Sequence, residues 1–179
     1  MWLDNAKHVI GDRWGVTEAE ITRRYPCDDL VPAPVLQAWR GVTVRAEPEI
    51  VWRWVTQIRL APYSYDWIDN LGHRSPRHLR PLPEPAPGEY FTTALGGHRF
   101  GKIVAVVPGE HLTGRIMGAV MSYVLVREDL TTRLLLKIVM AQGRLTAPLL
   151  TIADLVMARR QLLNLARLAE QTSPMRPVE

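Results

Sequence analysis

The region between residues 89 and 140 constrains the fold more than any other part of the sequence. It carries five segments of β-branched, aromatic and aliphatic residues, and Gly96-Gly97, Pro108-Gly109-Glu110 and Glu128-Asp129 interrupt them. Intervals this short permit hairpins, whereas parallel neighbours would need crossovers of a dozen or more residues. The sequence therefore predicts an antiparallel meander with strands at 89–95, 99–107, 112–118, 119–127 and 131–140.

A strand followed by two helices is predicted ahead of the meander. The alternation at 42–46 indicates the strand, and Pro48 suits the first position of a helix whose apolar residues recur on one face as far as Ile58. A shorter helix is predicted at 63–72. The prolines between residues 73 and 88 exclude a regular helix or a central strand, so that segment is predicted to be an extended loop.

The end of the chain changes to a helical period. Thr151 and Asp154 have the spacing of a capping box, and apolar residues then recur as far as Leu168. One helix about 30 Å long is therefore predicted to follow the strands. Helices segregated from an antiparallel sheet define an α+β fold, in which the last helix must cover one face of the sheet.

The 179 residues suffice for one domain with extensions. Residues 39–172 are predicted to form that domain, 1–38 an N-terminal arm and 173–179 a frayed tail. Within the arm, Thr17 and Glu20 fit a capping box for a short helix at 17–24. The segment 25–29 has the composition of a turn.

Composition excludes several classes of protein. Hydrophobic residues make up 47% and charged residues 22%, as in ordinary globular domains, which argues against disorder and fibrous repeats. No apolar run reaches the ~18 residues of a membrane-spanning helix, and the first residues lack the apolar core of a secretory signal, so we expect a cytoplasmic protein. The single cysteine, Cys27, cannot form an internal disulfide.

The net charge of +4 raises the question of a polyanionic partner. The basic residues are almost all arginine and are spread along the chain, and the one dense stretch, at 73–80, lies in the proline-rich segment without interleaved aromatic residues. We interpret this stretch as a solvated loop and expect no nucleic acid. An anionic lipid or an acidic partner remains the alternative.

The order of elements and three local strings carry a resemblance to a known superfamily. The strings at 45–55, 63–67 and 154–160 resemble those of actinobacterial members of the START-like superfamily, also called SRPBCC or polyketide cyclase/dehydrase and lipid-transport-like, and the likeness extends from about residue 12 to 170. The resemblance implies a helix-grip fold, with a curved antiparallel sheet wrapped around the long C-terminal helix and an apolar cavity between them. Members bind lipids, sterols or polyketides, and some cyclise or dehydrate them. No catalytic motif is shared across the superfamily.

Candidate residues for binding a ligand in such a cavity come from the strands, the short helix and the final helix. They are Tyr63, Tyr65, Asp66, Phe91, His98, Phe100, Arg115, Met117, Met121, Tyr123, Val156 and Arg160. Each has a structural alternative, because aromatic and aliphatic side chains equally fill a core. Asp66 could cap a helix, His98 could lie on a hairpin surface, and Arg159 or Arg160 could form an ion pair with Asp154.

Motifs for phosphate, metal and nucleophilic chemistry fail on inspection. The string 96–102 matches the glycine and lysine positions of a phosphate loop, but Ile103 replaces the required Ser or Thr and a strand follows instead of a helix. The five histidines lack metal-ligand spacing. Cys27 precedes two aspartates, which would raise the pKa of its thiol. We therefore expect no metal and no cofactor.

The sequence favours a protein that binds a small hydrophobic or amphipathic ligand, such as a lipid or polyketide, between sheet and helix. One alternative is an enzyme of the cyclase or dehydratase type, which would need an acid or base directed into the cavity; the candidates are Tyr65, Asp66, His98, Arg115 and Tyr123. The other is a protein-interaction module with a filled core. Neither the ligand nor the oligomeric state follows from the sequence.

Overall fold

The computed structural model describes residues 12–141 and 148–173, with the side chains of 148–156 outside that description. Residues 1–11 of the predicted arm and 174–179 of the predicted tail also lie outside it. In chain order the elements are β1 (Arg13–Trp14), α1 (Glu18–Thr22), α2 (Pro26–Leu30), β2 (Leu36–Val44), α3 (Pro48–Thr56), the 3-10 helix η1 (Gln57–Arg59), α4 (Asp66–Asp69), β3 (Thr92–Ala94), β4 (His98–Phe100), β5 (Lys102–Val107), β6 (His111–Ile116), β7 (Ala119–Glu128), β8 (Thr131–Met140) and α5 (Pro148–Thr172).

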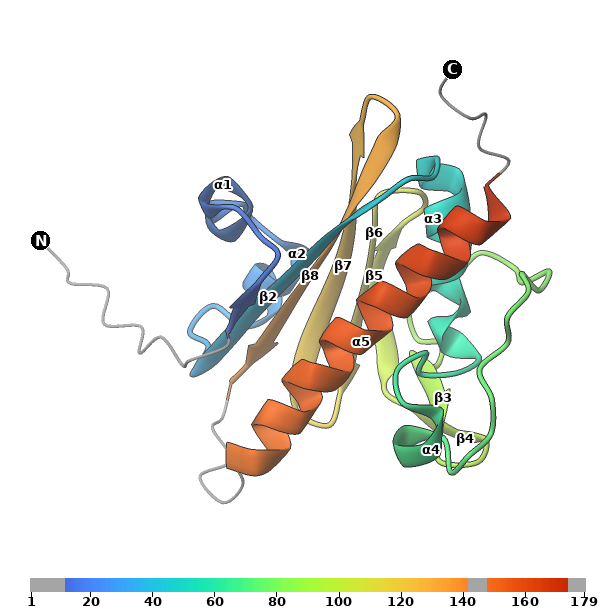
Figure 1. Cartoon of the computed structure of the whole chain (residues 1–179). Helices are drawn as coiled ribbons and strands as arrows, with labels where there is room; N and C mark the ends of the chain where they lie inside the picture. The colour runs from blue at the N-terminus through green and yellow to red at the C-terminus, as the bar shows by residue number, and fades with distance from the viewer. Residues whose placement is uncertain (1–11, 142–147, 174–179) are drawn as a thin grey trace, which may run out of the picture.

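The main sheet has the strand order β1-β2-β8-β7-β6-β5, and only the β1–β2 pair is parallel. The predicted meander is confirmed for β5 to β8, where β7 and β8 pair along their whole length. Two adjacent strands, β3 and β4, form a separate small sheet. Figure 1 shows α5 lying across the main sheet, as the predicted helix-grip fold requires.

Two predicted strands are wrong in detail because of one glycine. Gly101 has a φ of +64° and divides the predicted strand 99–107 into β4 and β5. A Cβ at this position would lie 2.6 Å from the carbonyl oxygen of Arg115, so the chain needs glycine to pass β6 so closely. The predicted strand 89–95 shortens to Thr92–Ala94 and pairs with β4 instead of joining the main sheet.

The other boundaries differ in ways that have local causes. The first long strand runs from Leu36 to Val44 because β8 pairs with it over that whole length. The predicted turn at 25–29 is helix α2, since Asp28 accepts a hydrogen bond from the amide of Tyr25 and Pro26 occupies the first turn. The helix predicted at 63–72 contains only α4, because Tyr63 is left-handed, with a φ of +56°.

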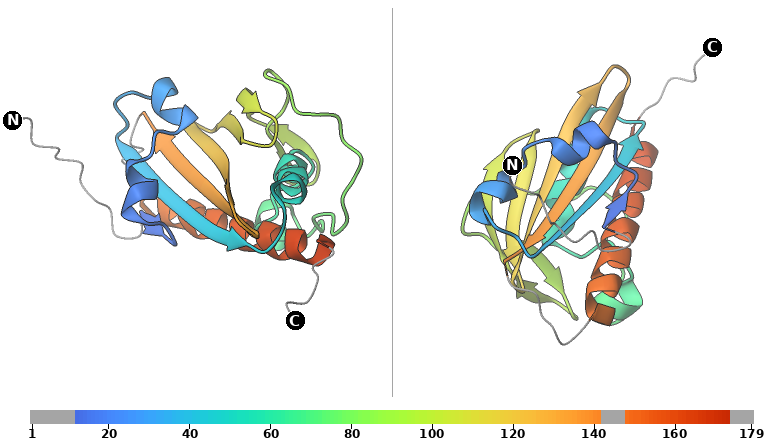
Figure 2. Two further views of the ribbon diagram at one scale, coloured as in Figure 1. Left: turned by 90° about the horizontal axis from the view of Figure 1, so that it is seen from above. Right: turned by 90° about the vertical axis from the view of Figure 1, so that its left-hand side faces the viewer.

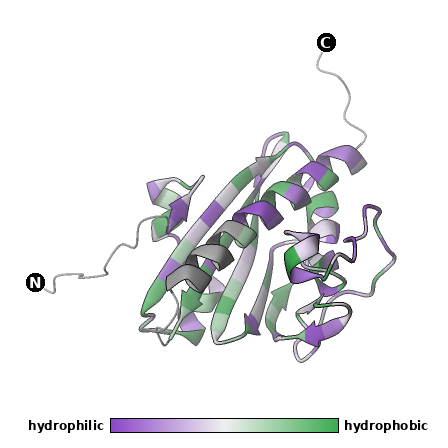
Figure 3. Cartoon of the chain, turned by 60° about the horizontal axis from the view of Figure 1, so that its bottom comes forward, coloured by the Kyte–Doolittle hydropathy of each residue, from purple (hydrophilic) through white to green (hydrophobic). Residues whose placement is uncertain are grey.

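The two faces of the main sheet are covered by different helices. Figure 2 shows α3 and α5 on one face, the inner face, and α1 and α2 on the other, the outer face. On the inner face Leu134 and Leu136 of β8 pack with Leu162 and Leu165 of α5 in one buried cluster. Figure 3 shows the resulting alternation of hydrophobic and hydrophilic segments along the strands.

The outer face has its own buried cluster, which joins the N-terminal segment to the sheet. Tyr25 and Cys27 are buried against Leu135 and Val139 of β8. The amide of Cys27 donates to Ser122 Oγ at 3.0 Å, and the ammonium of Lys137 pairs with Asp28. Burial raises the pKa of the Cys27 thiol to about 11, so the thiolate is disfavoured at neutral pH.

Backbone segments pack along both sides of the main sheet. On one side, the two-residue strand β1 pairs with β2, and Gly41 lets the segment around Gly15 that follows β1 approach the sheet, since a Cβ at Gly41 would lie 2.8 Å from the carbonyl oxygen of Gly15. On the other side, the amide of Gly88 donates to the Ile103 carbonyl of β5, and the Ile103 amide donates to the carbonyl of Glu89. The exposed hydrogen-bonding groups of the edge strands are thereby partly satisfied.

Candidate functional site

Four of the predicted ligand-binding residues line one groove. Tyr63, Tyr65 and Asp66 border it from the segment around α4, and Arg160 borders it from α5. The groove has a volume of about 390 Å³. The structure therefore brings together residues almost 100 positions apart, because α5 passes directly beside the segment 63–77.

Polar side chains of α5 hold that segment in place. Asn164 Nδ2 donates to the carbonyl oxygens of Tyr63 and Ser64 at 2.9 and 3.2 Å, and Gln161 Nε2 donates to the carbonyl of Pro62. These bonds satisfy carbonyls that the left-handed turn at Tyr63 would leave open. The wall of the groove beside α4 is thus fixed by the helix that forms its other wall.

Asp66 links the start of α4 to Ser75, which follows α4 in the chain. It is the first residue of α4, whose N-cap is Tyr65, so the interpretation of Asp66 as a helix cap is wrong. Its carboxylate instead accepts hydrogen bonds from the amide and hydroxyl of Ser75, the amide at 2.9 Å. Its negative charge is therefore directed toward the loop backbone.

The groove is rich in cations. Arg77, Arg160 and Arg167 line it, and Asp66 is the one acidic residue among its described lining. The Arg160 guanidinium lies 5.7 Å from the ring centroid of Tyr65, a cation–π distance that fixes its direction. A groove with this composition can accept an acidic group through charge-assisted hydrogen bonds.

The sequence contained a signal for two residues that the prediction missed. Asn164 and Arg167 follow Arg160 by four and seven positions, which places all three on one face of a helix. Arg77 carries no such signal, because its place in the groove depends on the path of the 73–88 loop.

Phe91 and Tyr123 lie between the inner face and the helices and are almost fully buried. Their ring centroids are 6.2 Å apart. The ring of Phe91 rests on Gly114, where a Cβ would lie 2.0 Å from it. Tyr123 Oη donates to Gln161 Oε1, and burial raises the pKa of its phenol well above the ordinary value. Both aromatic side chains are closely packed.

Met121 lies on the same face in a more open position. It is partly buried, as are Leu36, Ile116 and Ala119, and all four pack against the inner cluster. They form an apolar strip where β2, β6 and β7 approach the β6–β7 turn. The side chain of Val156 lies outside the described residues.

The remaining candidates lie away from the groove. Met117 is 77% exposed in the β6–β7 turn, and Arg115 is also exposed. His98 is exposed and its Nδ1 lies 2.8 Å from the carbonyl of Leu95, while Phe100 of the same strand is partly buried. Arg159 points to another side of α5 from Arg160, with its guanidinium 4.6 Å from the Trp14 ring centroid. The predicted ion pair with Asp154 falls outside the described side chains.

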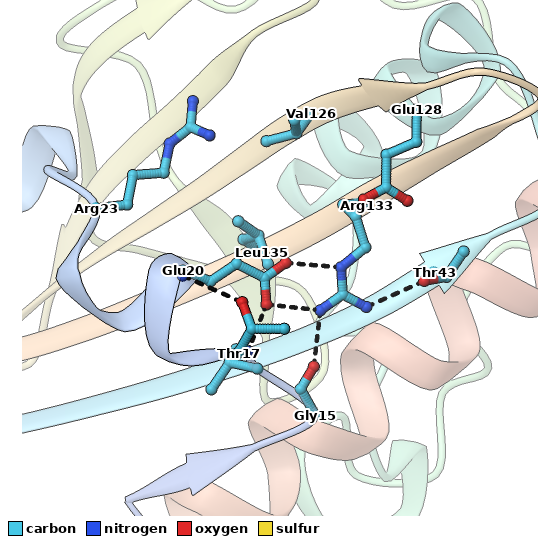
Figure 4. Close-up of a pocket in the computed structure, with 10 residues that line it drawn as sticks. Gly15, Thr17, Glu20, Arg23, Thr43, Val126, Glu128, Arg133 and Leu135 are labelled. Atoms are coloured by element: carbon cyan, nitrogen blue, oxygen red, sulfur yellow. Dashed lines mark hydrogen bonds and ion pairs between the residues drawn. The ribbon is translucent and has the colours of Figure 1, made fainter.

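A second groove, of about 630 Å³, lies on the outer face between α1 and the β7–β8 hairpin. Figure 4 shows Arg133 at its centre, bonded to Glu20, Thr43 and the carbonyl of Gly15. Burial acts to raise the pKa of Glu20, but hydrogen bonds from Arg133 and Thr17 hold it below the ordinary value. The Arg133 guanidinium is thus engaged in fastening α1 to the sheet, with little capacity left for a ligand.

The described part of the chain also limits the class of site. Within those residues, no cluster of three or more His, Cys, Asp or Glu side chains has the geometry to bind a metal ion. Across the same ranges, no helix combines the length and the apolarity needed to span a bilayer.

Comparison with known proteins identifies the fold. No family model matches the chain, and no curated protein matches it in sequence. Among solved structures, an AHSA1-like protein from Aeromonas hydrophila is similar over 80% of this chain and 100% of its own, with 16% identity and a TM-score of 0.52. The Aha1 dimer from Colwellia psychrerythraea aligns over 75% of this chain and 96% of its own, with 13% identity and a TM-score of 0.53.

A protein from Mesorhizobium loti is similar over 77% of this chain and 99% of its own, with 18% identity and a TM-score of 0.53. At these identities the likeness concerns the arrangement of the chain in space and leaves activity open. The α+β prediction of a curved sheet with a long C-terminal helix across it is confirmed, and the chain shares this helix-grip fold with the AHSA1-like structures.

Proposed function

We propose that this protein binds a small amphipathic molecule whose acidic polar end lies in the groove between the segment 63–77 and α5. The observation that carries the proposal is the gathering of Arg77, Arg160 and Arg167 in one groove beside α5, where the carboxylate of Asp66 is engaged by Ser75. Three guanidinium groups with so little local compensation favour an anionic guest such as a carboxylate.

The apolar part of the ligand is proposed to lie along the apolar strip of the inner face. The strip, which consists of Leu36, Ile116, Ala119 and Met121, keeps part of its surface outside the tightly packed core. Burying about 300 Å² of apolar surface, counted over ligand and protein, would contribute ~7 kcal/mol before the costs of association, so the charged contacts must supply part of the affinity.

Acid–base catalysis is less well supported than binding. Tyr123 is the buried candidate on the inner face, but its raised phenol pKa and its bond to Gln161 suit it to a structural role. His98 and Arg115 are exposed outside the groove. An effective general acid or base needs a pKa near the working pH and a position beside the substrate.

The test is thermal stabilisation of the full chain by fatty acids of increasing length, each compared with the alcohol of the same length. A ligand at 100 times its Kd should add about 2.7 kcal/mol to the free energy of unfolding. We expect the acids to stabilise the protein and the alcohols to do so much less. Native mass spectrometry of protein from its own host would show whether a ligand is retained.

Substitution in the groove makes the test specific. Arg160→Gln and Arg167→Gln should each weaken binding of the acid about tenfold, because a charge-assisted hydrogen bond is lost. Arg53→Gln, at an exposed position on α3, is the matched control and should leave binding unchanged. Equal stabilisation by acid and alcohol, or equal effects of the groove and control variants, would contradict the proposal.

A further inference from the structure

An exposed apolar surface surrounds α4 at the end of the molecule opposite the β7–β8 hairpin. The exposed fractions are 75% for Trp67, 65% for Leu71 and 43% for Leu95, and Ile68 of α4 and Met117 of the β6–β7 turn are also exposed. We call these five residues the apolar tip. Figure 1 shows α4, the β3–β4 hairpin and the β6–β7 turn at this same end.

Contacts between the segments show that most of the tip is one surface. The amide of Leu95 donates to the carbonyl of Asp69 at 2.8 Å, which joins the β3–β4 turn to the end of α4. The Leu71 Cδ1 atom lies 3.6 Å from the position that a Cβ on Gly96 would occupy. Gly101, just after β4, lies against Arg115 and Ile116 at the end of β6. The β6–β7 turn begins at the next residue and so lies close to the end of β4.

The polarity of α4 and the turn after it is inverted relative to a normal surface helix. Asp69 and Asn70 are buried, whereas Trp67, Ile68 and Leu71 face outward. The pair is held locally, because Ser64 Oγ bonds Asp69 Oδ2 and Asn70 Nδ2 donates to the carbonyl of His73, although Asp69 Oδ1 is buried without a hydrogen-bond partner among the described residues. A surface helix stabilises its own fold with the opposite arrangement. The outward apolar residues therefore serve something outside the chain.

Backbone conformation points the same way. In the described part of the chain, four residues other than glycine have positive φ, and three of them, Leu71, Leu95 and Met117, belong to the apolar tip. Left-handed backbone costs most residues about 1 kcal/mol, and Asn or Gly would adopt it more easily. Large apolar side chains at three exposed left-handed positions are thus unfavourable for folding, which indicates another role.

The charges around the tip decide which kind of partner fits. Arg74 and Arg77 are exposed, and no hydrogen bond or ion pair from the rest of the described chain engages them. Beside the β3–β4 hairpin, Arg99 and Lys102 lie over the exposed ring of Tyr90. The acidic groups of α4 are turned inward, Asp66 to Ser75 and Asp69 to Ser64. An apolar centre with a basic rim complements a surface that is apolar inside and anionic at its boundary.

We infer that the apolar tip docks on an anionic lipid bilayer. Trp67, Leu71, Leu95 and Met117 enter the headgroup region, where an amphipathic indole is favoured, and Arg74 and Arg77 contact acidic headgroups. Trp67 also lines the groove, so docking places the groove at the membrane surface. Only this last consequence, delivery of an amphipathic ligand from the bilayer, rests on the proposed function.

The test is sedimentation of the full chain with vesicles. We expect binding to equimolar phosphatidylglycerol and phosphatidylcholine, little binding to phosphatidylcholine alone, and weakening by salt. Leu71→Asn combined with Leu95→Asn should weaken binding about tenfold through lost apolar contact. Arg74→Glu should weaken it about fivefold or more, since each basic residue near an anionic surface contributes on that order.

Matched controls separate docking from stability and from ligand binding. Asn suits left-handed backbone, so the double variant should keep the wild-type melting temperature. Leu130→Asn removes a leucine that is 80% exposed on the β7–β8 turn and should not alter vesicle binding. Arg160→Gln should impair binding of the acidic ligand in the groove while vesicle binding persists, so the two proposals can fail separately.

Quenching by brominated lipids gives a direct reading. The chain has six tryptophans, and the quenched fraction of their fluorescence on anionic vesicles should be lost in Trp67→Phe while the signal of the buried Trp39, Trp52 and Trp54 stays. Failure to bind anionic vesicles, equal binding to neutral ones, or equal losses in the Leu130→Asn control would overturn the inference. Binding of the apolar tip to a protein, with no binding to vesicles, would also overturn it.

Discussion

The two ends of the molecule use the same residue types in opposite ways. At the hairpin end, Arg127 pairs with Glu47 and Glu49, and Trp54 Nε1 donates to Thr172 Oγ1 at 3.0 Å. At the apolar tip, Arg74 and Trp67 face solvent. At the β7–β8 end, arginine and tryptophan form ion pairs and hydrogen bonds within the chain, whereas at the apolar tip the same residue types face solvent. Whether an arginine or a tryptophan is exposed in this chain therefore depends on where it lies in the fold, and the arginine-rich composition alone does not explain it.

The largest expected effect comes from replacing Trp54 by alanine, compared with the same change at Trp67. Trp54→Ala should lower the free energy of unfolding by about 3–5 kcal/mol, because it empties a site that is 1% exposed and removes an edge-to-face contact with Tyr63. Trp67→Ala should change it by about 0.5 kcal/mol or less. Urea unfolding of both variants measures the difference, and similar losses would mean that Trp67 is structural after all.

A second prediction concerns the buried carboxyl beneath the tip. Burial raises the pKa of Asp69 to about 6, against an ordinary value near 3.8. The folded state therefore binds this proton more tightly than the unfolded state, and the associated stability is present at low pH and is lost as pH rises through about 6. The loss is on the order of 2 kcal/mol.

Asp69→Asn removes this titration while keeping the side-chain volume. We expect the melting temperature of the wild type relative to the variant to fall as pH rises from 3.8, the ordinary pKa, to about 6 and then to level off. Thermal melts at several pH values give the comparison. Parallel curves for the two proteins would show that Asp69 titrates with an ordinary pKa.

The smallest expected effect concerns the surface ion pairs. Arg127→Ala should cost about 1 kcal/mol or less, with the cost shrinking at high salt, because both partners of each pair are more than half exposed. Arg74→Ala should cost nothing measurable. If Arg74→Ala destabilises the protein as much as Arg127→Ala does, then the tip arginines have partners that hold the fold.

The sequence predicted the parts of the fold that depend on local pattern. The meander and α3 follow from alternation and from the helical period, which the structure preserves. The division at Gly101 could not be predicted, since it depends on close approach to Arg115. The burial of Cys27 likewise depends on Ser122, 95 positions away, which no local pattern reports.

The candidate site was predicted in part for the same reason. Tyr63, Tyr65 and Asp66 lie in one short segment, so a site that includes one of them is expected to include the others. Their meeting with Arg160 depends on how α5 crosses the sheet. Met117 was placed among the cavity candidates because the predicted strand 112–118 runs two residues past the end of β6, into a turn where Met117 is left-handed.

Cover along both margins of the main sheet decides how the molecule can meet others. The segment around Gly15 lies over β2, and Gly88 and Glu89 bond to β5. At the β5 margin these bonds occupy groups that a strand from another molecule would otherwise use, which favours recognition there through side chains. On the other side, a β-carbon at Gly41 would lie 2.8 Å from the Gly15 carbonyl oxygen and 2.7 Å from the Arg133 guanidinium, so any larger residue there would loosen the N-terminal segment from the sheet.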